Sequence, residues 1–214
     1  ISYEGIYCGN GYTISGLRIT TRHEPGNIGL FGSIGYENSL LTGIHLRDVE
    51  ITGTNIASIG ALAGRVGNGT VTLCSAQGKI EATFGSGSAC VGGLVGIAVE
   101  CSINRCHTNV DITAEAPLQD DDYAYAGGIV GRNNRSLFIN STLFACRAEG
   151  SVSLTGTGTS THPQPLCAGG IAGHNDEGWS IHACMATGNV NVTYTGTDAV
   201  NTYVGGLVGY NIGL

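Results

Sequence analysis

The stretch GGLVG at residues 92–96 decides the fold, because the same phrase returns along the chain at nearly regular intervals. The six copies are IGLFG (28–32), GALAG (60–64), GGLVG (92–96), GGIVG (127–131), GGIAG (169–173) and GGLVG (205–209). Each has an aliphatic residue in third place, and the closing glycines lie 32 to 42 residues apart. Units of this length joined by loops of unequal length indicate a stacked repeat protein.

A second phrase follows the middle copies and predicts a β-strand. The chain runs CRAEGSVSL from Cys146 and CMATGNVNV from Cys184. Alternating residues predict a strand with one buried face, which in the first case comprises Phe144, Cys146, Ala148, Gly150, Val152 and Leu154. In the first repeat, the same alignment puts His45 at the position of the cysteine.

The fold class follows from these two phrases. Because no segment shows a capped helical period, we predict an all-β chain that forms a right-handed parallel β-helix (β-solenoid) of about seven coils. A β-propeller or β-sandwich is the alternative, although the repeat lacks the fourth strand and the paired hairpin turns of a propeller blade. We expect residues 1–214 to form a single repeat domain, with an N-terminal coil at 1–26 and repeats that start near residues 27, 58, 90, 125, 167 and 203.

The composition excludes several classes of protein. With 36 glycines but 42% hydrophobic residues, the chain is too apolar to be disordered. A net charge of −7, with Lys79 as the single lysine, leaves no basic patch for a phosphate backbone, so we expect no nucleic-acid partner. No apolar run is long enough for a membrane span. The last repeat stops within its unit, so we expect a section of something longer.

The two phrases together resemble the GLUG repeat, whose form is G-G-L-V-G-x-N followed by N-C-x-A-x-G-x-V. The residues that carry the resemblance are GGLVGYN at 205–211 and CMATGNV at 184–190, and it covers about residues 27 to 214. GLUG repeats occur in large bacterial surface and secreted proteins, including adhesin-like proteins and non-catalytic regions of IgA-specific metallopeptidases. The resemblance therefore implies an extracellular or cell-surface module, and it transfers no catalytic residue.

Two sets of residues recur at fixed positions and predict structural ladders. Asn133, Asn175 and Asn211 each lie four residues after the aliphatic residue of the phrase, so their amides would hydrogen bond from coil to coil. Cysteines at one position of the second phrase would stack inward on four coils: Cys74, Cys106, Cys146 and Cys184. A reduced ladder is the favoured reading, and disulfides such as one between Cys74 and Cys106 remain an alternative.

Candidate chemical sites are sparse. The chain has no CxxC pair, which argues against zinc, and HEPGN at residues 23–27 lacks the second histidine of a zinc protease. Asp120, Asp121 and Asp122 form a weak calcium candidate, since calcium takes carboxylate ligands, but the spacing fits no EF-hand. We predict neither catalytic residues nor a cofactor.

The sequence therefore favours a non-enzymatic extracellular repeat module with an adhesion or spacer role. A host glycan or protein, or neighbouring domains of a longer chain, would be its partners, and binding would map to the longer insertions at residues 115–125 and 155–166. The alternatives are a carbohydrate-active β-helix enzyme, either a lyase or a hydrolase, and a non-catalytic region of a secreted IgA-type peptidase.

Overall fold

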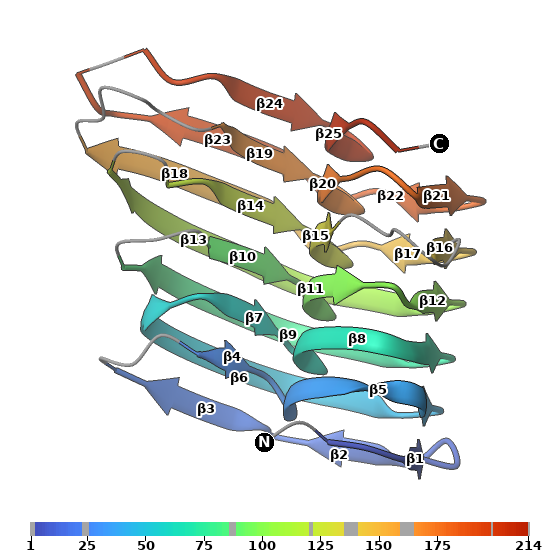
Figure 1. The fold of residues 1–214 in the computed structure, drawn as a ribbon. Helices are drawn as coiled ribbons and strands as arrows, with labels where there is room; N and C mark the ends of the chain where they lie inside the picture. Colours follow the sequence, from blue (N-terminus) through green and yellow to red (C-terminus); the bar gives the residue numbers. More distant parts are fainter. Residues whose placement is uncertain are drawn as a thin grey trace.

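The computed structural model describes residues 3–22, 26–85, 89–119, 122–134, 141–158, 165–197 and 199–213. Within these residues every regular element is a β-strand, and all strand pairs are parallel. The strands form three sheets, and each coil of the chain crosses sheet C, then sheet A, then sheet B (Figure 1). The predicted parallel β-helix is thus confirmed, whereas propellers and sandwiches are built from antiparallel sheets.

The three sheets hold ten, nine and six strands. Sheet A contains β1 (Ile6–Cys8), β5 (Phe31–Thr42), β8 (Ala63–Thr72), β11 (Val95–Val99), β12 (Ser102–Asn104), β15 (Val130–Asn134), β16 (Ser141–Phe144), β20 (Ala172–Asn175), β21 (Trp179–His182) and β25 (Val208–Asn211). Sheet B contains β2 (Thr13–Ser15), β3 (Arg18–Thr21), β6 (His45–Ile56), β9 (Ser75–Phe84), β13 (His107–Leu118), β17 (Arg147–Ala148), β18 (Val152–Gly158), β22 (Met185–Ala186) and β23 (Val190–Tyr194). Sheet C contains β4 (Asn27–Ile28), β7 (Ser58–Gly60), β10 (Ala89–Gly92), β14 (Ala124–Gly127), β19 (Leu166–Gly169) and β24 (Thr202–Gly205).

The stack makes about five full turns, not the seven coils that we predicted. The prediction counted both end units as coils. Strands β1, β2 and β3 precede the first complete turn, and β24 and β25 follow the last, so each end unit contributes only part of a circuit. In Figure 1 sheet C runs from left to right in front and sheet B returns behind it while the chain climbs, which makes the helix right-handed.

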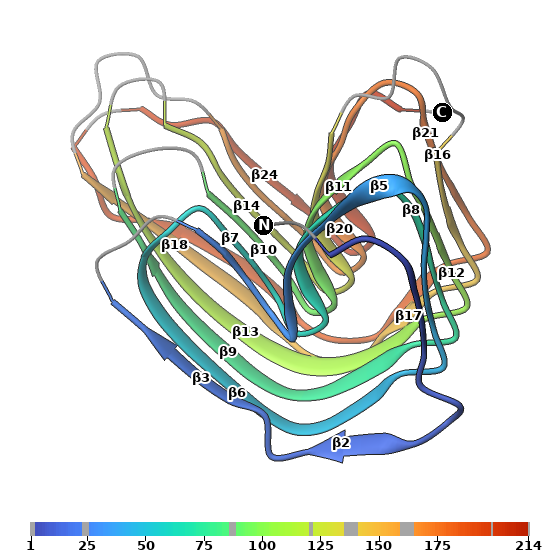
Figure 2. The ribbon, with the colours of Figure 1, turned by 60° about the horizontal axis from the view of Figure 1, so that its bottom comes forward.

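Sheet A bends, so the cross-section resembles a V. Strands β5 and β8 run through the bend, whereas in later coils the sheet divides into a first limb (β11, β15, β20 and β25) and a second limb (β12, β16 and β21). Figure 2 shows sheet C and the first limb as the two arms of the V, with the second limb and sheet B closing the outside. The repeated phrase forms the apex between the two arms.

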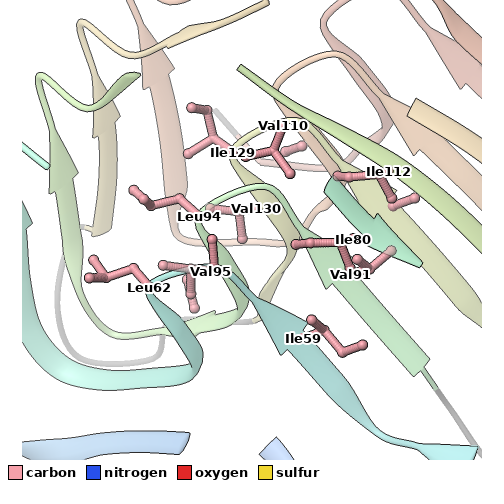
Figure 3. Close-up of a cluster of buried hydrophobic side chains, with 14 of the residues drawn as sticks. Ile59, Leu62, Ile80, Val91, Leu94, Val95, Val110, Ile112, Ile129 and Val130 are labelled. Atoms are coloured by element: carbon pink, nitrogen blue, oxygen red, sulfur yellow. The ribbon is translucent and has the colours of Figure 1, made fainter. Parts of the chain in front are cut away.

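Glycine is required at the apex because the coils approach closely there. A Cβ added to Gly170 would contact the carbonyl oxygen of Gly206 in the next coil. The aliphatic third residue of the phrase points inward, and Leu62, Leu94, Ile129 and Ile171 are all fully buried. Figure 3 shows three of these side chains meeting residues from all three sheets, such as Val91, Val130 and Ile80. The repeated phrase therefore supplies both the close turn and one layer of the core.

At the corner between the second limb and sheet B, the structure differs from the predicted strand in two details. The residue before each ladder cysteine has a positive φ, as at Leu73, Arg105, Ala145 and Ala183. Because this turn interrupts the alternation, Phe144 is exposed and does not share the buried face of Cys146. His45 pairs with Ser75, so Ile44, not His45, stands at the level of the cysteines.

The insertions that we expected to carry binding are partly strand. Residues 115–118 belong to β13, and residues 155–158 belong to β18. Both segments pair along their length, from Glu115 with Thr155 to Leu118 with Gly158. They therefore extend sheet B and are not free loops.

Candidate functional site

The asparagines form a hydrogen-bonded row on the first limb of sheet A. Nδ2 of Asn133 donates to Oδ1 of Asn175 at 2.8 Å, and Nδ2 of Asn175 donates to Oδ1 of Asn211 at 2.7 Å. Strand register places Ala98 one coil before Asn133. Oδ1 of Asn133 consequently has no hydrogen-bond partner among the described residues. The row pairs the buried amides of Asn133 and Asn175 within the stack and ends at the exposed Asn211.

The four cysteines stand one above another on consecutive coils at the corner that opens sheet B. Strand register places Cys74, Cys106, Cys146 and Cys184 at one level, and all four are free thiols. Each thiol donates to the carbonyl oxygen two residues before it, and a second carbonyl one coil earlier lies 3.5 to 3.8 Å away. The Cys146 and Cys74 side chains, together with burial, raise the pKa of Cys106 well above its usual range. Such a thiol stays protonated and is a poor nucleophile.

A second cluster of buried side chains fills the V between sheet C and the first limb, and its signal in the sequence is the alternation of cysteine and tyrosine four residues before the aliphatic residue of the repeated phrase. Cys90, Tyr125 and Cys167 are its buried members, with Ile97, Tyr123 and Tyr210 packed against them. Neighbouring rings follow one another from Tyr123 through Tyr125, His174 and Tyr210 to Tyr203, at centroid distances of 4.6 to 5.2 Å. We call this set the groove cluster; it joins the two arms much as a small core would.

Arg132 supplies the charge of the groove cluster. Its guanidinium lies 4.9 Å from the ring centroid of Tyr123, donates to the Tyr123 hydroxyl at 2.7 Å and pairs with Asp176 at 3.3 Å. Burial, with Arg132 nearby, lowers the pKa of His174 to about 4, so this histidine is neutral near pH 7. Burial also raises the pKa of Cys90 and of Cys167 to about 12. His174, Cys90 and Cys167 are thus uncharged at neutral pH.

The calcium candidate is only partly within the described residues. Asp120 and Asp121 lie outside them. Asp122 is buried, and its carboxylate accepts a hydrogen bond from the backbone N–H of Gln119 at 3.2 Å, which closes a turn. Within the described ranges, no group of three His, Cys, Asp or Glu side chains is placed to hold a metal ion. No helix in that part of the chain is long and apolar enough to cross a membrane.

The outer face of sheet B carries the exposed charges. One ionic row joins Arg18, Glu50, Lys79 and Glu81 on three successive coils, with nitrogen–oxygen distances of 3.1 to 3.2 Å. A second row, at the start of the strands, places Thr13, His45, Ser75 and His107 in register. Nδ1 of His45 lies 2.8 Å from Oγ of Ser75, and Nε2 of His107 lies 3.3 Å from Glu149. Sequence patterning missed this second row, because its members share strand register but no residue type.

Comparison with known proteins gives one similarity. The chain is 31% identical over 141 residues, or 65% of its length, to a halomucin of Haloquadratum walsbyi (strain DSM 16790 / HBSQ001). The chain corresponds to about 2% of the length of that protein. No family model matches the chain, and no solved structure matches it.

Proposed function

We propose that this chain is a non-enzymatic section of a stacked scaffold that lies outside the cell or on its surface and spaces or displays other parts of a longer protein. The resemblance to GLUG repeats supports that location. The similarity to a halomucin is compatible with a surface or extracellular protein. Neighbouring domains, host glycans and host proteins are the partners that such a scaffold would present or meet.

The observation that carries the scaffold role is the exposure of the last layer of the stack, which β24 and β25 form. Val204 is 51% exposed and Leu207 is 48% exposed, although their register partners Ala168 and Ile171 are fully buried. Apolar side chains in positions that the coils from Ile59 and Leu62 to Ala168 and Ile171 bury make β24 and β25 a surface on which a further coil can stack. A coil added there would stack by the same rule as the coils below it.

An extended chain tests the scaffold role. A copy of residues 174–214 placed directly after Gly209 would continue the repeat with its own spacing. We expect the extended chain to unfold at a higher denaturant concentration and with a larger m-value, because one more coil is buried. An unchanged midpoint and m-value, with the added residues sensitive to protease, would contradict a continuing stack.

Location has its own test. An antibody raised against this section should label intact cells of the source organism, and mild protease treatment of those cells should remove the signal. Labelling that appears only after lysis would contradict an extracellular or surface location, and it would leave the stacking result untouched.

A further inference from the structure

Two adjoining depressions open on the outer face of sheet B, at the corner where the chain leaves the second limb of sheet A. One has a volume of about 310 Å³ and lies over the row from Thr13 to His107, and the other has a volume of about 530 Å³ and lies beside it at the corner. Both are lined by His45, Ser75 and His107, so they form one hollow, which we call the corner hollow. The corner lies at the lower right of Figure 2, near the label β17. Its size suits a small ligand.

The corner hollow is basic in an acidic protein. Arg47 and Arg105 line it together with the two histidines, and no carboxylate lines either depression, although the chain carries a net charge of −7. Neither arginine forms an ion pair with any residue that the structure describes. A third depression farther along sheet B, of about 240 Å³, is lined by Glu81 and Glu115. The corner hollow therefore presents guanidinium donors that no carboxylate of the described residues occupies.

Backbone strain points to the same place. Leu73 and Arg105 line the corner hollow with φ angles of 56° and 52°, in the left-handed region that bulky side chains avoid. The same corner carries Gly43 in an earlier coil and Ala145 and Ala183 in later ones. Leu73 is also 51% exposed, so burial does not explain it. At this corner, large side chains stand at two of the positions that border the hollow and the other positions carry glycine or alanine, which favours a role for Leu73 and Arg105 at this surface.

We propose that the corner hollow binds an acidic sugar, with the carboxylate of a uronic acid held by Arg105. A guanidinium matches a carboxylate through two parallel hydrogen bonds. Leu73 lines the same depression as Arg105 and offers an apolar surface to the face of a pyranose ring, and Ser75 and His107, which line both depressions, offer hydrogen-bonding groups to the ring hydroxyls. This site lies on a strand face and not in the insertions, and it does not depend on the scaffold role.

The net negative charge of the chain favours a ligand that carries few negative charges. A polyanion would approach a molecule of net charge −7. Repulsion from this net negative charge disfavours a densely sulfated chain and tolerates a single carboxylate. A monoanionic sugar is thus the best match to the corner hollow.

The test is a titration with methyl α-galacturonoside, followed by backbone amide NMR shifts in β6, β9 and β13. We expect millimolar binding, and at least tenfold weaker binding of the neutral methyl α-galactoside. Arg105→Gly should weaken binding at least tenfold because a charged hydrogen bond is lost, while the protein becomes more stable as the backbone strain is relieved. Loss of binding in a more stable protein cannot be attributed to misfolding.

Ala145→Gly is the matched control, since it relieves the same backbone angle one coil later without touching the corner hollow. It should leave binding unchanged. Equal binding by the Arg105→Gly and Ala145→Gly variants would overturn the site, and equal binding of the neutral galactoside would overturn recognition of the carboxylate. Acetate or N-acetyl-leucine binding as tightly as the uronoside would overturn the sugar and indicate a simple anion or peptide carboxylate instead.

Discussion

The left-handed residues before the ladder cysteines show how one backbone angle shapes a coil. At Ala145 and Ala183 the φ angles are 53° and 52°, and the chain turns there from the second limb into sheet B. The turn aims the following cysteine inward, where its thiol can donate to carbonyl oxygens of the corner. A methyl side chain pays a steric penalty at this angle that glycine avoids.

We therefore predict that Ala145→Gly raises the free energy of unfolding by about 0.5–1 kcal/mol, the left-handed penalty less the greater freedom of glycine in the unfolded chain. Urea denaturation measures it. The control is Gln77→Gly, at an exposed strand position without a positive φ, which should destabilise the protein. Destabilisation by both glycines would show that the corner is not strained.

His174 makes stability depend on pH. It is only 6% exposed, its ring lies between the tilted rings of Tyr125 and Tyr210, and the charged groups near it are Arg132 and Asp176. Its pKa is lowered to about 4 in the folded protein against about 6.5 when unfolded, so the unfolded state binds more protons between these values. The contribution of neutral His174 to the free energy of unfolding is therefore fully present above pH 6.5 and decreases as the pH drops towards 4.

We expect wild type to lose about 3 kcal/mol relative to His174→Phe between pH 6.5 and pH 4, because phenylalanine keeps the stacked ring and cannot be protonated. Denaturation at a series of pH values gives the difference. Parallel curves for the two proteins would mean that protonation of His174 is not opposed by folding.

Among the elements, the asparagine row connects β15, β20 and β25. Asn175→Ala would leave the amide of Asn133 and the carbonyl of Asn211 without partners, and Asn133 is fully buried. We predict a loss of about 3 kcal/mol, measured by urea denaturation. Asn211→Ala at the exposed end of the row should lose only about 1 kcal/mol. Equal losses would imply that the amides act independently.

The apex of the V gives a matched pair of glycines. Gly170→Ala places a methyl group against the carbonyl oxygen of Gly206, whereas a Cβ on Gly206 meets nothing within 4 Å. We predict a loss of about 3 kcal/mol for Gly170→Ala and a change within about 0.5 kcal/mol for Gly206→Ala, compared by thermal denaturation. If Gly206→Ala is equally harmful, the clash is not the reason for the glycine.

At the scale of the whole molecule, each coil is stabilised mainly by the coils next to it. Strands β13 and β14 have neighbours on both sides, whereas β24 and β25 have a partner on one side only. We predict that amide hydrogen exchange is slowest in β13 and β14 and becomes faster towards β24 and β25, because opening starts at an uncovered rung. Exchange mass spectrometry resolves the gradient, and uniform protection would indicate one cooperative unit.

Much of the fold was predictable because the repeat is local in sequence. The recurring glycines and the alternation after each cysteine were enough to predict parallel coils. The face of the sheet on which Phe144 lies was not predictable, since alternation assumes an unbroken strand and the left-handed turn at Ala145 interrupts that strand. The prediction that His45 stands at the level of the cysteines was wrong for a similar reason. Strand register, and not spacing along the sequence, decides the partner of His45, which is Ser75.

The contacts of the groove cluster across the V, and the corner hollow, were hidden for another reason. Tyr125 and His174 meet across the V although they lie on different strands of different coils, and a period within one repeat cannot show that contact. His45, Ser75 and His107 line one hollow although their side chains differ from coil to coil. Sequence repetition reports what the coils share, whereas these sites depend on where the coils differ.

The parallel pairing of successive coils has a mechanical consequence. Hydrogen bonds between parallel strands join one coil to the next, so they point along the stack axis. A pull along that axis loads one coil boundary after another, and the terminal coil peels away first. Each released coil of 32 to 42 residues adds slack of about 100–150 Å, at roughly 3.3–3.6 Å per extended residue. Under tension such a stack lengthens in steps and absorbs work while the remaining coils stay folded.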